Sequence, residues 1–134
     1  MPTLGRKLKI LTSKTFKVLI ADDSAFIRKI LKDILKEIGF FNFLEAKNGK
    51  EALKIYKKEK PDLILLDIIM PILSGLDFLK KIKKEDVKKV IVVSVVKDKI
   101  RRKKAKEIGV KHYISKPFRK ESLLKEVNKI LKRK

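Results

Sequence analysis

Five polar side chains stand directly after, or close behind, short apolar runs of the chain. Asp22 and Asp23 follow the first run, Asp67 follows the third, Ser94 follows the fourth, and Lys116 comes two residues after the fifth. If these runs are parallel strands, the five side chains meet at one edge of a sheet, because ligands of such sheets bind at the carboxyl ends of the strands. The set would combine three carboxylates, a hydroxyl and an ammonium group.

The three carboxylates indicate cation-assisted phosphoryl chemistry. Asp22, Asp23 and Asp67 would repel one another unless a hard cation lay among them. Carboxylates, water and a backbone carbonyl are ligands that suit Mg²⁺. A carboxylate beside such an ion can attack phosphorus while a lysine neutralises charge on the phosphoryl oxygens. We therefore predict that Asp67 is the nucleophile and that the other two carboxylates hold the metal. Ser94 and Lys116 are predicted to contact phosphoryl oxygens.

Each of these residues, taken singly, has a simpler interpretation. An aspartate after a strand is often the N-cap of a helix, and Asp23 with Ser24 could cap a first helix. A lysine such as Lys116 could lie on the solvated surface. The phosphoryl interpretation therefore depends on the conjunction of all five side chains at one edge of the sheet.

The elements that would position these residues alternate along the chain from Phe16 onward. Short apolar runs alternate with longer runs of helical period, which is typical of βα repeats and a parallel sheet. The predicted strands are Lys17–Ala21, Asn42–Ala46, Asp62–Leu66, Lys89–Val93 and His112–Ile114. The third and fourth runs are continuously apolar, so we expect these strands to be central and covered on both faces.

Five helices are predicted between and after the strands. In the first, apolar residues recur at helical spacing from Phe26 to Ile38, and Gly39 follows as a C-cap. The others are predicted at Lys50–Lys60, Gly75–Lys84, Lys99–Ile108 and Lys120–Leu131. The predicted fold class is α/β, a doubly wound five-stranded parallel sheet with five helices. Residues 16–134 would form this domain, and residues 1–15 a mobile basic N-terminal arm or one extra edge strand.

Composition bounds where the protein works and what it binds. Its 134 residues suit one domain, and they include no cysteine and no apolar run of membrane-spanning length, so we expect a cytoplasmic protein without a membrane span. The 37 basic and 16 acidic side chains give a net charge of +21. This charge could attract nucleic acid or another anion, or it could be the lysine-rich surface typical of thermophilic proteins. We favour the second because the lysines are spread along the chain.

Four segments together resemble a known family. They are Val-Leu-Ile-Ala-Asp-Asp-Ser at 18–24, Leu-Leu-Asp-Ile-Ile-Met-Pro at 65–71 with Gly75 after it, Ser94, and Ser-Lys-Pro-Phe at 115–118. On these segments the chain, from about Phe16 to Leu131, resembles the receiver domains of two-component response regulators, of the CheY-like single-domain type. The stretch at 22–31 is similar to that of chemotaxis regulators. The resemblance implies a flavodoxin-like fold with strand order 2-1-3-4-5.

The resemblance also implies a phosphorylation site and its metal ligands. It implies that Asp67 is the phosphoacceptor. It implies further that Mg²⁺ is the cofactor and that four residues hold it, namely the carboxylates of Asp22, Asp23 and Asp67 and the backbone carbonyl of Ile69.

A second group of residues is implied to carry the signal. Ser94 would be the signalling hydroxyl, and Lys116 would bind phosphate next to a cis bond to Pro117. Tyr113 would be an aromatic that changes rotamer, and the output surface would be the fourth helix, the fifth strand and the fifth helix. From the residues alone, Tyr113 is equally well a half-buried aromatic of an edge strand, and His112 beside it is expected at the surface.

The expected function is that of a stand-alone response regulator in a two-component or chemotaxis phosphorelay. A histidine kinase or a phosphotransfer protein would phosphorylate Asp67, and phosphorylation would change the affinity for a downstream protein. Such a protein is a signalling protein rather than an enzyme, because it catalyses only its own phosphorylation and dephosphorylation. The alternative is a degenerate receiver domain that binds nucleic acid or another anionic partner through its basic surface. A nucleotide enzyme is disfavoured because the chain has no phosphate-binding glycine motif.

Four positions differ from the commonest pattern of the family. Ser74 stands where Asp or Asn is frequent before the glycine, and Val95 stands where a smaller residue usually follows the hydroxyl. Ile69 and Val96, two residues after the phosphoacceptor and the hydroxyl, are aliphatic where many members carry polar side chains. Two aliphatic side chains would exclude the water that hydrolyses an aspartyl phosphate, so we expect the phosphorylated form to be long-lived.

Overall fold

The computed structural model describes residues 16–95 and 97–132. The predicted arm at 1–15 and the aliphatic residue Val96 lie outside the described residues. Within the described ranges, no helix is both long enough and apolar enough to cross a membrane.

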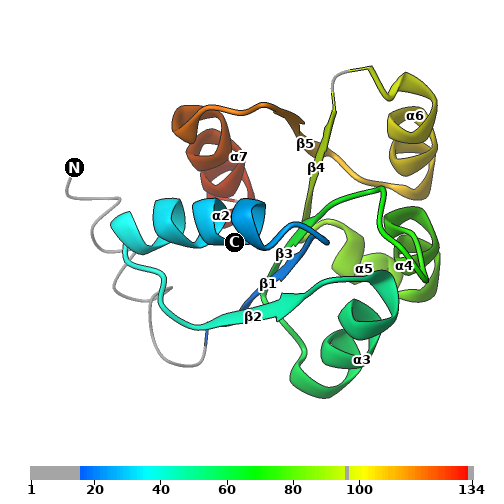
Figure 1. Ribbon diagram of the computed structural model, residues 1–134, viewed down its shortest axis with the longest axis horizontal. Helices are drawn as coiled ribbons and strands as arrows, with labels where there is room; N and C mark the ends of the chain where they lie inside the picture. Colours follow the sequence, from blue (N-terminus) through cyan, green and yellow to red (C-terminus); the bar gives the residue numbers. More distant parts are fainter. Residues whose placement is uncertain (1–15, 96, 133–134) are drawn as a thin grey trace.

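The described chain forms one parallel sheet of five strands, shown in Figure 1. The strands are β1 (Val18–Ala21), β2 (Phe43–Ala46), β3 (Leu63–Leu66), β4 (Val90–Val95) and β5 (His112–Lys116). Their order is β2-β1-β3-β4-β5, as the resemblance implied. The two most apolar strands, β3 and β4, are buried along their described lengths except at Val95, which agrees with their predicted central position.

Two of the strands run further than the sequence predicts. The predicted strands end at Val93 and Ile114, whereas β4 continues to Val95 and β5 continues to Lys116. Ser94 and Lys116 therefore lie inside strands instead of after them. The reason is pairing, because the ladder between these strands continues through the pairs Ser94–Ser115 and Val95–Lys116, and local composition does not reveal such pairs.

Six helices of the described residues pack on the sheet, one more than predicted for this part of the chain. They are α2 (Ala25–Glu37), α3 (Gly49–Glu59), α4 (Gly75–Lys81), α5 (Lys84–Val87), α6 (Lys99–Ile108) and α7 (Lys120–Lys132). The prediction of five helices was therefore wrong. The helix predicted over 75–84 ends at Lys81, and a separate short helix, α5, follows it. The chain turns to extended geometry at Ile82, with φ −94° and ψ 165°, and buries that side chain in the core.

A tertiary contact holds the additional helix in place. The buried hydroxyl of Tyr56 on α3 donates to the carboxylate of Asp86 on α5. The same hydroxyl accepts a hydrogen bond from the backbone N–H of Lys83, at 3.1 Å. These contacts join segments about 30 residues apart, so periodicity in the sequence could not indicate them.

Each face of the sheet has its own core, because successive strand side chains point to opposite faces. Helices α2 and α7 cover one face, and α3, α4, α5 and α6 cover the other (Figure 1). The first core includes Val18 and Ile20 of β1 packed with Leu35 of α2, and the second includes Leu19 of β1 packed with Phe78 of α4.

The two loops that lead into α2 and α4 are fixed by short contacts. Ser24 caps α2, since its Oγ accepts a hydrogen bond from the N–H of Ile27 at 3.2 Å, so the cap does not use the Asp23 side chain. Gly75 begins α4, and a Cβ at this position would lie 2.3 Å from the carbonyl oxygen of Asp67. Only glycine fits so close to the backbone, which explains its place in the motif.

His112 is buried, contrary to the expectation that it lies at the surface. Its side chain on β5 is 2% exposed, and Nδ1 lies 3.0 Å from Oε1 of Glu126 on α7. Glu126, which lies 14 residues further along the chain, supplies a hydrogen-bond partner for Nδ1, whereas Nε2 has no partner among the described residues.

Candidate functional site

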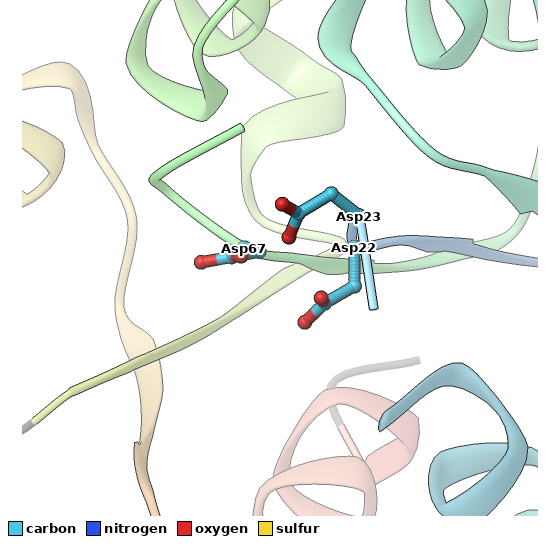
Figure 2. Close-up of side chains that lie close together, drawn as sticks. All are labelled: Asp22, Asp23 and Asp67. Carbon is cyan, nitrogen blue, oxygen red and sulfur yellow. The ribbon is translucent and has the colours of Figure 1, made fainter. Parts of the chain in front are cut away.

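Three carboxylates meet at the carboxyl ends of β1 and β3. Each of Asp22, Asp23 and Asp67 offers an oxygen that lies within 4.8 Å of the oxygens offered by the other two. Figure 2 shows the three side chains gathered beside these strand ends. Asp22 and Asp67 are 1% and 7% exposed, whereas Asp23 is exposed to solvent. The convergence predicted from the sequence is therefore confirmed.

Backbone and side-chain hydrogen bonds fix Asp22 in the site. Its carboxylate Oδ1 accepts a hydrogen bond from the N–H of Ser24 at 2.9 Å. Its carbonyl accepts one from Nη1 of Arg28 at 2.6 Å, and its N–H donates to the carbonyl of Ala46 on β2 at 3.0 Å. Sequence reasoning did not single out Arg28, although its position one turn into the first helix is what brings it back over the strand end.

Asp67 is held beside this residue by the central strands. Its N–H donates to the carbonyl of Ala21 on β1 at 2.9 Å, and its Oδ1 accepts a hydrogen bond from the N–H of Ile69 at 3.2 Å. Burial, and then the negative charge of Asp22, raise the pKa of the Asp67 carboxyl from 3.8 to about 6, although the charge of Lys116 and the hydrogen bond from Ile69 oppose the shift. The ionised carboxylate is thus kept in an unfavourable environment.

Lys116 joins the two buried carboxylates. Its Nζ lies 2.8 Å from Oδ2 of Asp22 and 3.4 Å from Oδ2 of Asp67. The Lys116–Pro117 peptide bond is cis, as the resemblance implied. Burial lowers the pKa of Lys116, but the hydrogen bond to Asp22 and the two carboxylate charges raise it above its ordinary value. The lysine therefore stays positively charged in the site.

The charge and the donor set of the site fit a divalent cation. Three carboxylates and one ammonium group leave a net charge of about −2 when all are ionised. All the acidic ligand atoms are oxygens, which hard cations such as Mg²⁺ prefer. Asp22, Asp23 and Asp67 could hold such a cation. The predicted role of the Ile69 carbonyl stays a prediction, because the structure describes only the N–H contact of that residue and a side chain that is 50% exposed.

The predicted signalling residues Ser94 and Tyr113 lie on the neighbouring strands β4 and β5. Ser94 is 2% exposed, and its Oγ has no hydrogen-bond partner within the described part of the chain. Tyr113 is half-buried on the neighbouring strand, and its hydroxyl donates to the carbonyl of Val110 at 2.8 Å. The hydroxyl of Ser94 is thus free to take a new partner.

A second residue that sequence reasoning did not single out is Arg102 on α6. Its Nη2 donates to Oγ of Ser115 at 2.8 Å, and its Cζ lies 5.6 Å from the centre of the Tyr113 ring. Arg102 stands among the basic residues of α6, so no feature of the sequence distinguishes it from its neighbours.

Comparison with known proteins shows the family of this chain. The response regulator receiver domain family matches residues 18–128. The chemotaxis protein CheY of Thermotoga maritima is 41% identical over 117 residues, which are 87% of this chain and 98% of that protein. CheY of Halobacterium salinarum is 39% identical, over 86% of this chain and 96% of that protein. The solved CheX–CheY–BeF3–Mg²⁺ complex of Borrelia burgdorferi has a TM-score of 0.78 at 34% identity, over 86% of this chain and 88% of that chain.

The fold and the site define a response regulator receiver domain, and the chain belongs to that family. Within the family it is CheY-like, since it covers nearly the whole length of two chemotaxis proteins of this type. It is thus a receiver domain of two-component or chemotaxis signalling.

The pKa of Asp67 predicts a pH-dependent gain of stability on removal of its charge. The carboxyl ionises near pH 3.8 in the unfolded chain and at about 6 in the folded one, so the folded state binds this proton more tightly. Above about pH 6 the ionised group destabilises the fold. Asp67→Asn should therefore raise the free energy of unfolding by about 1 to 3 kcal/mol at pH 7.5 in EDTA.

This gain should shrink as pH falls through 6 and vanish below about 4, where both states bind the proton. The measurement is urea denaturation across this pH range. Glu85→Gln, at an exposed carboxylate of α5, serves as the control and should change little at any pH. A constant gain for Asp67→Asn at every pH would contradict the assignment.

Proposed function

We propose that the protein is a response regulator whose Asp67 accepts a phosphoryl group from a phosphohistidine of a histidine kinase or a phosphotransfer protein. A carboxylate oxygen of Asp67 attacks phosphorus, the P–N bond breaks, and its electron pair leaves with the histidine nitrogen. The product is an acyl phosphate. The observation that carries the proposal is the convergence of Asp67, two further carboxylates and Lys116 at the end of a central strand.

Mg²⁺ is proposed as the cofactor. Asp22, Asp23 and Asp67 would hold it, together with the backbone carbonyl of Ile69. When bound, the ion neutralises negative charge on the carboxylates and on the phosphoryl oxygens. The solved complex of the B. burgdorferi relative contains Mg²⁺ and BeF3, which supports this choice.

The chain's own residues would perform the remaining steps. Lys116 already lies against the carboxylates, so it can pair with a phosphoryl oxygen once the product forms. Ser94 can donate the hydrogen bond that its buried Oγ lacks, and Tyr113 would then follow toward the space that the serine leaves. The surface of α6, β5 and α7 would change its affinity for a downstream protein.

The proposed activity is signalling and not turnover of an external substrate. Asp67 is both the nucleophile and the carrier of the product, so the protein catalyses only its own phosphorylation and dephosphorylation. The alternative of a degenerate receiver that binds nucleic acid has no support in the site, where the carboxylates and the lysine are all in place. Of the two arginines on α6, Arg101 pairs with Asp98 and Arg102 turns toward β5.

The first test of this proposal is phosphoryl labelling. Incubation with a small phosphodonor such as acetyl phosphate and Mg²⁺ should add the mass of one phosphoryl group to the chain. Asp67→Asn should abolish the addition, because the amide keeps the shape but not the nucleophilic oxygen. Asp77→Asn, at an exposed aspartate of α4, should label like the natural protein. Labelling that persists in Asp67→Asn would disprove the assignment.

The second test concerns the metal. Because the site carries uncompensated negative charge, saturating Mg²⁺ should raise the melting temperature, by about 3 to 10 °C, through ligand linkage. Asp23→Ala should lose most of this rise, since Asp23 is the solvent-exposed member of the three. NaCl at matched ionic strength separates binding from screening of the +21 charge. If Mg²⁺ raises the melting temperature of Asp23→Ala as much as that of the natural protein, the ion binds elsewhere.

The third test concerns the lifetime of the phosphorylated form. Ile69 is 50% exposed beside the phosphoacceptor and cannot orient water, so Ile69→Asn should speed the loss of phosphate, on the order of tenfold. The measurement is decay of the labelled protein in Mg²⁺ at one temperature. Ile72→Asn is the matched control, an exposed isoleucine of the same loop, and should leave the rate unchanged. Equal decay in all three proteins would show that Ile69 does not gate the water.

A further inference from the structure

Arg102 links α6 to the strand that carries the switch aromatic. Tyr113 and Ser115 are two residues apart on β5, so both side chains point to the same face of the sheet, which α6 covers. The guanidinium of Arg102 contacts both: Nη2 donates to Oγ of Ser115 at 2.8 Å, and Cζ lies 5.6 Å from the centre of the Tyr113 ring. This distance is within the range of a cation–π contact.

Arg102 differs from the other basic residues of its helix. Arg101 is exposed and pairs with Asp98 at the start of the helix, whereas Arg102 is half-buried. Ala105 is the one described residue of α6 that is fully buried, and Arg102 adds polar contacts from this helix to β5. Its Nε is buried without a hydrogen-bond partner in the described part of the chain, so the contact is only partly satisfied.

The contact lies directly beside the predicted signalling hydroxyl. Ser94 of β4 pairs with Ser115 of β5, and Val92 pairs with Tyr113, so the two serines are lateral neighbours on the sheet. The hydroxyl of Ser115 is held by Arg102, whereas that of Ser94 has no partner among the described residues. The hydroxyl of Tyr113 is directed to the carbonyl of Val110 and not to Ser94.

We propose that Arg102 is a positioning residue that holds Tyr113 in this resting arrangement and so sets how readily phosphorylation switches the protein. The proposal rests on the proposed function of Asp67. Movement of Tyr113 toward Ser94 has to break the ring contact with Arg102 and the hydrogen bond to Val110. The free energy of these contacts is therefore subtracted from the response to phosphorylation.

The same contact connects the switch to the proposed output surface. A hollow of about 1110 Å³ lies between α6 and β5, and its lining includes Lys99, Arg102, Lys103, Val110 and Tyr113. Release of Tyr113 would free the guanidinium and reshape this hollow, so the surface that a downstream protein contacts would change together with the aromatic.

The experiment compares three variants in their binding of beryllofluoride, a phosphoryl mimic, with Mg²⁺. Arg102→Leu removes both contacts, and Arg102→Lys keeps the charge but not the planar fork. Arg101→Leu is the matched control, because it removes one charge from the exposed side of the same helix. The chain has two tyrosines and no tryptophan, so NMR of ring-labelled tyrosine gives two residues to follow, with Tyr56 on α3 as the internal reference.

Before ligand is added, Arg102→Leu should move the Tyr113 signal and leave the Tyr56 signal in place. Its half-saturating beryllofluoride concentration should fall about threefold to tenfold relative to the natural protein. The value for Arg102→Lys should lie between those of the natural protein and Arg102→Leu, and the value for Arg101→Leu should equal that of the natural protein. Loss of the positive charge of Arg102 would by itself weaken binding of the beryllofluoride anion. Tighter binding in Arg102→Leu therefore indicates that Tyr113 has been released from its contact with Arg102.

The possible failures are distinguishable. Unchanged affinity in Arg102→Leu, with a natural protein that saturates normally, would overturn the role of Arg102 and leave the proposed function intact. An absence of any response to beryllofluoride and Mg²⁺ in the natural protein would overturn the proposed function, and the switching role of Arg102 with it. If Arg102→Leu does not fold, Arg102→Lys decides the first question, because it still loses the fork.

Discussion

Repulsion among three carboxylates at one strand edge is the constraint on which this molecule depends. Asp22 and Asp67 are nearly buried, and Asp23 lies within 4.8 Å of them at the surface. Lys116 compensates only part of this charge, and burial together with the charge of Asp22 raises the pKa of Asp67 to about 6. A fold optimised for stability alone would not keep such a group, whereas a site for a cation and a phosphoryl group requires it.

Parallel pairing makes this concentration of charge possible. Ala21 and Leu66 are partners in the ladder between β1 and β3, so the residues that follow them necessarily emerge side by side. The ladder between β4 and β5 does the same for Ser94 and its neighbour Ser115. Gly75 lets the loop after Asp67 lie against the strand end without a steric clash. The rigid sheet thus supplies the precision, and the loops supply the chemical groups.

The charge on the rest of the surface has a different character. The lysines are distributed over the chain, and several pair with nearby acids, as Lys29 does with Asp33 and Lys120 with Glu37. Exposed pairs of this kind contribute little individually to stability. Arg102 differs from these exposed lysines, because its planar group reaches inward to β5 instead of outward to solvent. The proposed bias on the switch therefore depends on this one arginine.

The sequence by itself determined the alternation of strands and helices along the chain, because this depends on local periodicity. It also determined that the three carboxylates and the lysine meet at one edge, because parallel strands present their carboxyl ends together. Only the tertiary structure decided that Ser94 and Lys116 lie within strands, that α5 is a separate helix, that His112 is buried, and that Arg102 reaches Tyr113. These features come from contacts between segments distant in the chain. Their free energy depends on which side chains meet, and a local pattern contains no information about the partner.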